Sequence, residues 1–374
     1  METSAKQEKK KILQIGYLAL GKGGIQAVVM NIVRGLGREF SFDILLLSNK
    51  EGFYDEEFKT YGNIYRVDCS VEGCGKLKRY FRYATRPFKQ FLGAYRLIKA
   101  NRYDVVHIHS GHDGGPMFLA AKCAGVKHIV AHSHNAESPE KRTLFSRIYR
   151  KLGQCIVRRT ATVKIGVSEV ANRYLYGGDA SFIVNNPVDL EKFTRLERSN
   201  NGGKIVLTNV GRYSFQKNQE FCVEILKALL AKGSDAEFNL IGWGENEERL
   251  KKLINEQGLE KEARLIDGGG DADVPALLAA SDVFVFPSRY EGLGIVALEA
   301  QAAGCLCVAS DAVPKTTDLG MCEYLSLQEA SDVWAEKIVE MWEHKERYRL
   351  NNEALEQFST ENVWKAFREL YAGL

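Results

Sequence analysis

The chain has 374 residues, of which 45% are hydrophobic and 26% are charged. This composition is close to that of ordinary globular proteins and excludes disordered, collagen-like and disulfide-scaffold proteins. The length predicts two or three domains. No apolar stretch approaches the roughly 18 uninterrupted residues of a membrane span, so we expect no transmembrane helix.

Charge is divided unevenly along the chain. Residues 1–190 carry 30 Lys and Arg against 17 Asp and Glu, a net charge of +13, whereas residues 191–374 carry a net charge of −10. Two basic stretches, 75–99 and 141–160, contain no acidic residue, and apolar residues such as Phe81 and Phe88 recur there at helical spacing. Nucleic acid, an anionic membrane or an anionic substrate would be attracted to such surfaces, and a solvated face without a partner is the alternative.

The eight cysteines form no CxxC pair. Residues 9–20 imitate a signal peptide, but Glu2 and Glu8 interrupt a positive leader, so we interpret this segment as a buried first strand. Without a secretory signal the cysteines indicate a reducing compartment, and we expect them to be small core residues.

Strand-like runs alternate with amphipathic segments through the first half. The predicted strands are 12–19, 42–48, 105–109, 129–132, 164–167 and 182–184. The predicted helices are 24–36, 88–101, 115–124 and 168–176. This alternation is typical of a parallel sheet whose strands are connected by helices.

A second series follows the turn Asn185-Asn186-Pro187 and the polar stretch 199–203. Its predicted strands are 205–210, 237–241, 263–266, 283–286 and 306–309, with helices at about 218–232, 245–257, 273–280 and 294–303 and helical sequence from about 328 to the end. We therefore predict two doubly wound, Rossmann-like α/β domains, residues 1–187 and 188–374, with the last helix packing back on the first. Ligands of such sheets bind at the carboxyl ends of the strands, so we expect the working site in the cleft between the domains.

Two glycine-containing strand ends predict phosphate binding. The segment LGKGGIQ, residues 20–26, places Gly23 and Gly24 where a helix starts, so backbone N–H groups can meet an oxyanion; a plain tight turn is the alternative. In GRYSFQKN, Arg212 supplies a planar fork and Lys217 a mobile point charge, which suits a diphosphate. Gly242 follows the next strand and would let backbone approach a flat ligand.

The segment SRYEGLGIVALEAQAAG, residues 288–304, carries two glutamates. Glu291 closes the loop after a strand, Gly292 and Gly294 leave backbone amides uncovered, and Glu299 lies inside the following helix. Amide donors suit a phosphate and carboxylates accept from hydroxyls, so this loop is a sugar-nucleotide cradle in outline.

Six histidines, at positions 107, 109, 112, 128, 132 and 134, cluster in sequence. HxH spacing occurs at 107/109 and 132/134, and alternate residues of a strand share a face. Since no acidic residue or cysteine completes a clear ligand set, we expect no metal.

Taken together, GRYSFQKN, IGWGENEERL, DVPALLAASDVFVFPSRYEGLGIVALEA and AAGCLCVASD closely resemble the second domain of glycosyltransferase family 4. GKGGIQ and IVAHSHN fit its first domain, so the resemblance covers nearly the whole chain and includes the family's Glu-x7-Glu motif. The resemblance implies a GT-B fold, a nucleoside-diphosphate-sugar donor, and transfer with retention of anomeric configuration without an essential metal or other cofactor. Among such donors we favour a UDP-sugar.

The same resemblance assigns roles to individual residues. Arg212 and Lys217 would hold the diphosphate, Glu299 would accept from the ribose hydroxyls, and Glu291 would contact the sugar hydroxyls. Donor contacts are also implied for Gly23, Gly24, Gly242, Gly292, Leu293 and Gly294. His134 occupies the place of the family's active-site histidine, with its neighbour His132 as the alternative.

The acceptor implied is a glycan or lipid-linked sugar of cell-surface polysaccharide synthesis, as in bacterial capsule and exopolysaccharide enzymes. The basic first half leads us to expect peripheral attachment at the cytoplasmic face of the plasma membrane. A non-hydrolysing nucleotide-sugar epimerase and a catalytically inactive partner subunit are the alternatives. We expect no nucleic-acid partner, because no binding module is recognisable.

Overall fold

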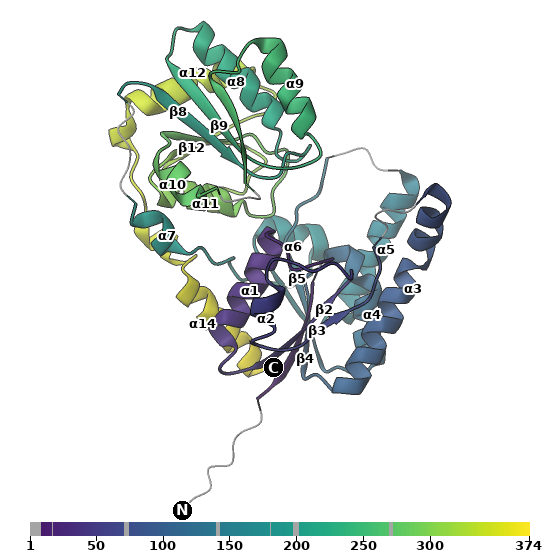
Figure 1. Cartoon of the computed structure of the whole chain (residues 1–374). Helices are drawn as coiled ribbons and strands as arrows, with labels where there is room; N and C mark the ends of the chain where they lie inside the picture. The colour runs from purple at the N-terminus through teal and green to yellow at the C-terminus, as the bar shows by residue number, and fades with distance from the viewer. Residues whose placement is uncertain are drawn as a thin grey trace, which may run out of the picture. The chain divides into compact units, whose positions relative to one another are not determined.

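The computed structural model describes residues 9–16, 18–70, 75–139, 143–179, 181–196, 202–268 and 272–374, which form two compact units (Figure 1). The first unit comprises Met1–Asn135, Lys141–Pro187 and Glu361–Leu374, and the second comprises Ala136–Glu140 and Val188–Thr360. The chain therefore completes the second unit and then returns to the first with its last helix.

The first unit is built on a seven-stranded parallel sheet in the order β3-β2-β1-β4-β5-β6-β7. Its strands are β1 (Lys11–Ile15), β2 (Ser41–Leu46), β3 (Ile64–Arg66), β4 (Val105–Ile108), β5 (His128–Ser133), β6 (Val163–Gly166) and β7 (Phe182–Ile183). The order reverses between β1 and β4, and the loops beyond the carboxyl ends of strands at such a switch point are where ligands of these sheets bind.

The second unit repeats this plan with six parallel strands in the order β10-β9-β8-β11-β12-β13. They are β8 (Ile205–Val210), β9 (Ala236–Gly242), β10 (Ala263–Asp267), β11 (Val283–Phe286), β12 (Leu306–Ser310) and β13 (Cys322–Leu325). Here the switch point lies between β8 and β11. Both sheets have the doubly wound topology that the sequence predicts.

Helices connect the strands. In the first unit they are α1 (Gly24–Leu36), α2 (Asp55–Phe58), α3 (Lys76–Asn101), α4 (Gly115–Cys123), α5 (Leu144–Thr160), α6 (Glu169–Tyr176) and α14 (Thr360–Gly373), with a 3-10 turn at Gly111–Gly114. In the second they are α7 (Leu190–Thr194), α8 (Gln219–Ala231), α9 (Glu247–Gln257), α10 (Val274–Ala279), α11 (Ile295–Ala302), α12 (Ser331–Glu343) and α13 (Asn352–Glu356), with 3-10 turns at Lys315–Thr317 and Lys345–Arg347.

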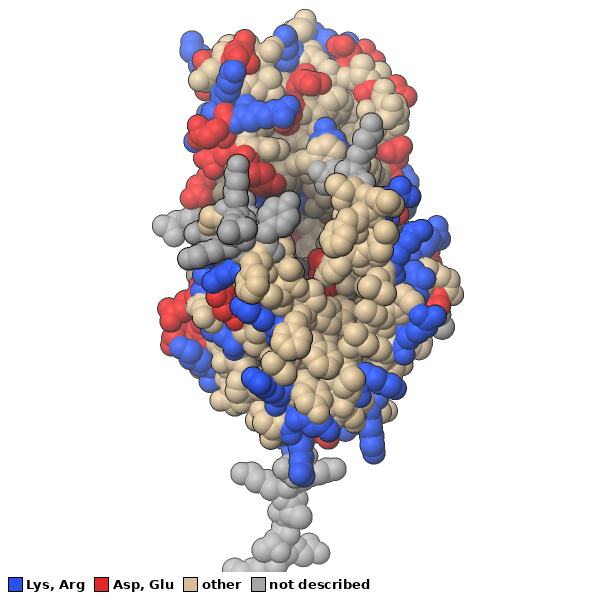
Figure 2. All heavy atoms as spheres, turned by 90° about the vertical axis from the view of Figure 1, so that its right-hand side faces the viewer, with Lys and Arg blue, Asp and Glu red and all other residues tan. Residues whose placement is uncertain are grey.

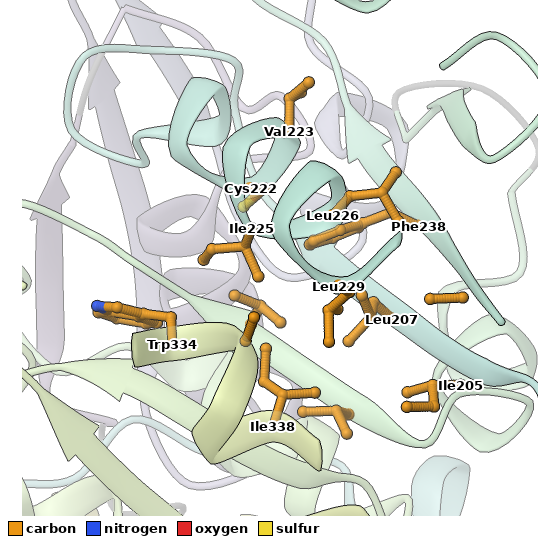
Figure 3. Packing of buried hydrophobic residues seen from close by; sticks show 14 of the residues in the cluster. Ile205, Leu207, Cys222, Val223, Ile225, Leu226, Leu229, Phe238, Trp334 and Ile338 are labelled. Carbon is orange, nitrogen blue, oxygen red and sulfur yellow. The ribbon is translucent and has the colours of Figure 1, made fainter. Parts of the chain in front are cut away.

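Each sheet is covered by apolar helix faces. In the first unit, Val28 of α1 and Phe367 of α14 belong to one buried cluster, whereas Ala94 of α3 and Phe118 of α4 belong to another. In the second unit, side chains of α8 and α12 pack together over β8 and β9, and Trp334 of α12 is fully buried there (Figure 3). Burial of such side chains contributes about 1.5–3 kcal/mol each and fixes the strand ends that carry the functional loops.

The structure departs from the sequence predictions at the sheet edges and in α3. The short edge strands β3 and β13 were not predicted, because three or four partly buried residues carry little periodicity. A helix was expected from residue 88, yet α3 begins at Lys76 and continues through Pro87. Proline removes one helical hydrogen bond, but the amphipathic spacing continues on both sides of it.

Two further expectations can be compared with the described residues. Five of the seven described cysteines are buried, as expected, but Cys123 is exposed and Cys155 is partly exposed, so the core interpretation is wrong for these two. In the part of the chain that the structure describes, no helix has both the length and the apolarity needed to cross a membrane.

Candidate functional site

A desolvated ion pair lies at the switch point of the second unit. Lys217 follows β8 and Glu291 follows β11, and Lys217 Nζ lies 2.8 Å from Glu291 Oε1. The two side chains are only 16% and 8% exposed, and Lys217 Nζ also lies 4.7 Å from the centroid of the Phe286 ring. A positive and a negative side chain, both largely removed from water, thus lie together at the carboxyl ends of the strands, where such sheets bind ligands.

Two glycines allow the loops around this pair to approach closely. A Cβ on Gly242 would lie 2.0 Å from the carbonyl oxygen of Gly211, so only glycine fits there. Gly294 caps the start of α11 with a φ of +91°, a conformation that side chains rarely adopt. Gly292 and Leu293, in the same β11–α11 loop, are buried.

Glu299 lies on α11 and is partly buried. Burial raises the pKa of its carboxyl to about 7, against the smaller opposing effect of the nearby cations of Lys192 and Lys217. This carboxyl therefore changes its charge near neutral pH, which an exposed glutamate does not.

Arg212 differs from Lys217 in exposure, although both are predicted to bind the diphosphate. Its side chain is 69% exposed and its Nε lies 3.0 Å from Glu245 Oε2. An exposed pair of this kind contributes little to stability, whereas the Lys217–Glu291 pair is desolvated. The structure therefore places one predicted phosphate-binding cation at the surface and the other in a buried pair.

Four histidines of the first unit, His107, His109, His132 and His134, lie at or just beyond the carboxyl ends of β4 and β5. His134 follows β5 and is partly exposed, its Nε2 lies 2.9 Å from His109 Nδ1, and burial lowers its pKa to about 3. His132 is 1% exposed, packs 5.9 Å from the Phe367 ring, and neither of its ring nitrogens has a hydrogen-bond partner among the described residues. Of the two histidines that the sequence leaves open, His134 is therefore the more exposed.

Three of these histidines meet the distance requirement of a candidate metal site. His107, His109 and His132 each offer a ring nitrogen within 4.8 Å of the others. The rings stack, however, at interplanar angles of 29° for His107–His109 and 15° for His107–His132. Ring nitrogens bind metals in the plane of the ring, so the nearly parallel rings of His107 and His132 do not converge on one ion in this arrangement, whereas the His109 and His132 planes are tilted by 42°.

The predicted glycines of the first unit lie at the start of α1. Gly23 is the N-cap residue in an extended conformation, and α1 begins at Gly24 without a side-chain cap. Gly24 is exposed, and no heavy atom of the described residues lies within 4 Å of the position that its Cβ would take. The first turn of α1 thus presents backbone donors beside open space.

The sequence analysis did not identify three residues that contact Lys217 or the histidines. Phe286 lies beneath Lys217, and Gln14 and Tyr371 extend the hydrogen bonds of the histidines. Gln14 carried a usable signal, because it is a lone amide inside the apolar strand KILQI. Tyr371 carried no signal of its own: the last helix was expected to pack on the first domain, but nothing in its sequence indicates which of its residues meets the histidines.

Known proteins are similar in sequence to this chain over most of its length. The profile for glycosyl transferases group 1 matches residues 191–356, and that for Glycosyltransferase Family 4 matches residues 22–192. The UDP-Gal:alpha-D-GlcNAc-diphosphoundecaprenol alpha-1,3-galactosyltransferase of Escherichia coli is 32% identical over 321 residues, covering 81% of this chain and 80% of that enzyme. The chain belongs to the family 4 glycosyltransferases. The putative glycosyltransferase EpsF of Bacillus subtilis is 28% identical over 348 residues, covering 88% and 87% of the two chains.

Solved structures show the same fold for this glycosyltransferase. Anabaena Alr3699/HepE in complex with UDP and glucose gives a TM-score of 0.75 at 18% identity, covering 98% of this chain and 100% of that one. Sucrose-phosphate synthase from Thermosynechococcus elongatus gives a TM-score of 0.75 at 16% identity, with coverage of 98% and 100%. The two parallel-sheet units are thus those of the GT-B fold, as the sequence resemblance implies.

Proposed function

We propose that this glycosyltransferase moves a sugar from a nucleoside-diphosphate sugar, a UDP-sugar, to a glycan or lipid-linked acceptor in the synthesis of a cell-surface polysaccharide. The observation that carries the proposal is the buried Lys217–Glu291 pair at the switch point of the second unit. A cation and a carboxylate held together out of water suit a substrate that brings both phosphate and hydroxyl groups.

Each member of the pair has a role in this reaction. The leaving diphosphate gains negative charge as the glycosidic bond breaks, and Lys217, Arg212 and the amino-terminal end of α11 stabilise that charge. Glu291 accepts from the sugar hydroxyls, and its charge favours the oxocarbenium-like sugar. Glu299 accepts from the ribose hydroxyls. Binding of the diphosphate replaces Glu291 as the partner of Lys217 and frees the carboxylate for the sugar.

Transfer proceeds with retention of anomeric configuration. It needs no metal ion, because fixed cations and helix-terminal N–H groups stabilise the charge of the leaving diphosphate that a divalent ion would otherwise stabilise. Exhaustive chelation is expected to leave the rate of transfer nearly unchanged. An absolute requirement for Mg²⁺ or Mn²⁺ would overturn this part of the proposal, and the anomeric configuration of the product, read by NMR, tests retention.

The substrate class is supported by the relatives. The name of the Escherichia coli enzyme gives UDP-Gal as donor and a diphosphoundecaprenol-linked sugar as acceptor, and a relative from Xanthomonas campestris, 28% identical over 303 residues, is named for GDP-mannose and a diphosphopolyprenol acceptor. A thermal-shift panel of UDP, GDP and their sugars tests the choice of base, since a ligand of the folded state raises the melting temperature. Stabilisation by GDP but not by UDP would overturn the UDP assignment.

A transfer assay separates the transferase from the alternatives. We expect sugar to appear on a lipid-diphosphate acceptor only when donor and acceptor are both present. An epimer formed from donor alone would identify an epimerase. Binding of the donor without transfer to any acceptor of a panel would identify an inactive relative.

A lipid-linked acceptor requires access to a membrane, and the helices α3 and α5 provide a suitable surface. Both pack against α4 and so cover the same face of the first sheet. Phe88 of α3 is 66% exposed, and Phe145 of α5 is 79% exposed. Figure 2 faces this side of the chain, where uncharged side chains occupy the centre and Lys and Arg lie around them. We propose that this basic apolar surface attaches the protein peripherally to the cytoplasmic face of the plasma membrane.

Vesicle sedimentation tests this attachment. Each engaged cation contributes about 1 kcal/mol near an anionic leaflet, so binding is expected with phosphatidylglycerol and not with phosphatidylcholine vesicles, and is expected to weaken at high salt. Glutamate substitution of the exposed cations Lys89, Arg147 and Lys151 should abolish sedimentation.

The matched control for this experiment is glutamate substitution of Lys252, Lys261 and Lys345, three exposed lysines of the second unit. This control changes the net charge equally and should leave sedimentation unchanged. Equal loss in both triple variants, or equal binding to both lipids, would contradict the proposed surface.

A further inference from the structure

A chain of buried hydrogen bonds connects the last helix to His134. Gln14 Nε2 donates to Tyr371 Oη at 3.1 Å, and Tyr371 Oη lies 2.7 Å from His107 Nδ1. On its other side, the Gln14 amide oxygen lies 2.8 Å from His109 Nε2, and His109 Nδ1 lies 2.9 Å from His134 Nε2. All five residues belong to the first unit, and four of them are 1% exposed or less.

The polarity of this chain follows from the orientation of the Gln14 amide, whose Nε2 faces Tyr371 Oη and whose oxygen faces His109 Nε2. The opposite orientation of this amide would reverse every tautomer along the chain. An amide oxygen only accepts, so the proton of His109 is on Nε2 and its Nδ1 is an acceptor. His134 must then donate from Nε2. At the other end, Tyr371 accepts from Gln14 and uses its single proton toward His107 Nδ1. His107, His109 and His134 are therefore all protonated on Nε2, which leaves the Nε2–H of His107 as a buried donor without a partner among the described residues.

Burial also disfavours the doubly protonated, charged form of these histidines, in which both ring nitrogens would be donors. Desolvation holds the pKa of His107 and of His134 at about 3, and that of His109 well below its usual range. Each ring is therefore neutral at physiological pH, with one donor and one acceptor. In His134 the remaining nitrogen, Nδ1, is a buried acceptor without a hydrogen-bond partner among the described residues.

An unsatisfied buried acceptor costs about 1–3 kcal/mol, so its presence in a native structure calls for an explanation. A hydroxyl group is the simplest donor that would satisfy it, and both substrates of a sugar transfer carry hydroxyl groups. The same acceptor would gain nothing from a phosphate oxygen or a carboxylate, which do not donate when ionised.

We propose that Tyr371, Gln14 and His109 are positioning residues that hold His134 protonated on Nε2, so that its Nδ1 accepts a hydrogen bond from a substrate hydroxyl. The tautomer of His134 follows from the orientation of the Gln14 amide within the hydrogen-bonded chain. Its effect on turnover rests on the proposed function, and the two parts are measured separately below.

The first measurement is the tautomeric state of His134. The full-length protein is labelled with ¹⁵N-histidine, and long-range ¹H–¹⁵N correlations distinguish Nε2–H from Nδ1–H rings; a His134→Gln variant assigns the signals. We expect His134 as the neutral Nε2–H tautomer at pH 7. An Nδ1–H ring, a charged ring, or a ring that coordinates added Zn²⁺ would overturn the proposal. This arm stands even if no transfer activity is found.

The second measurement uses a variant that lacks the Tyr371 hydroxyl, which lies several hydrogen bonds away from His134. Tyr371→Phe keeps the shape of the side chain but frees the Gln14 amide to reverse, so the His134 signals should report a mixture of tautomers. Turnover, kcat, should fall roughly tenfold, because a histidine in the wrong tautomer cannot accept, while KM for the donor changes less than twofold. Gln14→Leu, which interrupts the chain next to His109, should have the same two effects.

The matched control is Tyr176→Phe. Tyr176 is a fully buried tyrosine of the same unit whose hydroxyl lies 2.7 Å from the carbonyl oxygens of Ala131 and Ile165 and donates its proton to one of them, outside the histidine chain. This variant should lose comparable stability and keep both the His134 tautomer and kcat. If Tyr371→Phe leaves the tautomer and kcat unchanged, or if Tyr176→Phe lowers kcat equally, the positioning role is wrong.

Discussion

The two units use the same sheet plan but hold their functional side chains in opposite electrostatic states. At the switch point of the second unit, Lys217 and Glu291 form a desolvated ion pair. Around the strand ends of the first unit, His109 and His134 are kept neutral by burial. Burial therefore preserves charge where an opposite charge is paired with it, and removes charge where only like groups are neighbours.

This difference fits a division of labour in sugar transfer. In the proposed reaction the second unit supplies the charge that a diphosphate needs, and the first unit supplies the directed hydrogen bond that recognises a hydroxyl. The predictions below test this contrast between a charged second unit and a neutral first unit.

The largest effect is expected from Lys217→Met. Removing the ammonium leaves Glu291 as an uncompensated buried charge, so the free energy of unfolding should fall by about 3–5 kcal/mol. Transfer should also lose about 2–4 kcal/mol of transition-state stabilisation, because one diphosphate contact disappears. Denaturant unfolding and kcat/KM measure the two effects.

Arg212→Ala is the matched control, because it removes a cation that is paired at the surface. It should lower kcat/KM by a similar mechanism, yet change the free energy of unfolding by no more than about 1 kcal/mol. Equal destabilisation by both variants, or full activity in either, would contradict the distinction between the two cations.

The next effect separates the two glutamates of the second unit. Glu291→Gln should lower kcat by about 100-fold, because the amide keeps the shape but loses the charge that favours a cationic sugar. Glu299→Gln should mainly raise KM for the donor, because the role proposed for this carboxyl is to accept from the ribose hydroxyls. Steady-state kinetics of both variants decides, and equal effects confined to KM would make Glu291 a binding residue only.

The lowered pKa values of the buried histidines predict that the free energy of unfolding of the first unit falls in acid. Burial lowers the pKa of His107 and His134 to about 3, below the ordinary value of 6.5. The unfolded chain therefore binds more protons between pH 6.5 and 3, and stability is lost as the pH falls through this window. From pH 7 to pH 5 the first unit should lose about 2 kcal/mol or more. Hydrogen exchange resolved by peptide measures this, and constant protection of β4 and β5 would contradict it.

The smallest effect has the opposite sign and lies in the second unit. Burial raises the pKa of Glu299 to about 7 from 4.5, so the folded state binds the extra proton and stability falls as the pH rises from 4.5 to 7. Glu299→Gln should therefore stabilise the second unit at pH 8 by about 1–2 kcal/mol relative to pH 5, a range reduced for partial exposure. Peptide-resolved hydrogen exchange at the two pH values measures this stabilisation. If the substitution stabilises the second unit equally at both pH values, titration of the Glu299 carboxyl is not the cause.

The sequence by itself determined the local elements and the motifs. Apolar runs bounded by turn residues predicted β8 and β11 with the bounds that the structure gives, and the alternation of strands and helices predicted two doubly wound units. It also placed Lys217 and Glu291 at strand ends, because residues that follow parallel strands gather at one edge of a sheet. Periodicity and turn chemistry are local properties, so they can be read from neighbouring residues.

Only the tertiary structure decided which of these residues meet. Lys217 and Glu291 are 74 residues apart, and Gln14 and Tyr371 are 357 residues apart, so neither contact has a local signal. The difference between Arg212 and Lys217 likewise follows from burial, which depends on how loops pack over the sheet. Strand order and the return of α14 to the first unit bring these groups together, and both are set by the packing of whole elements rather than by any short stretch of sequence.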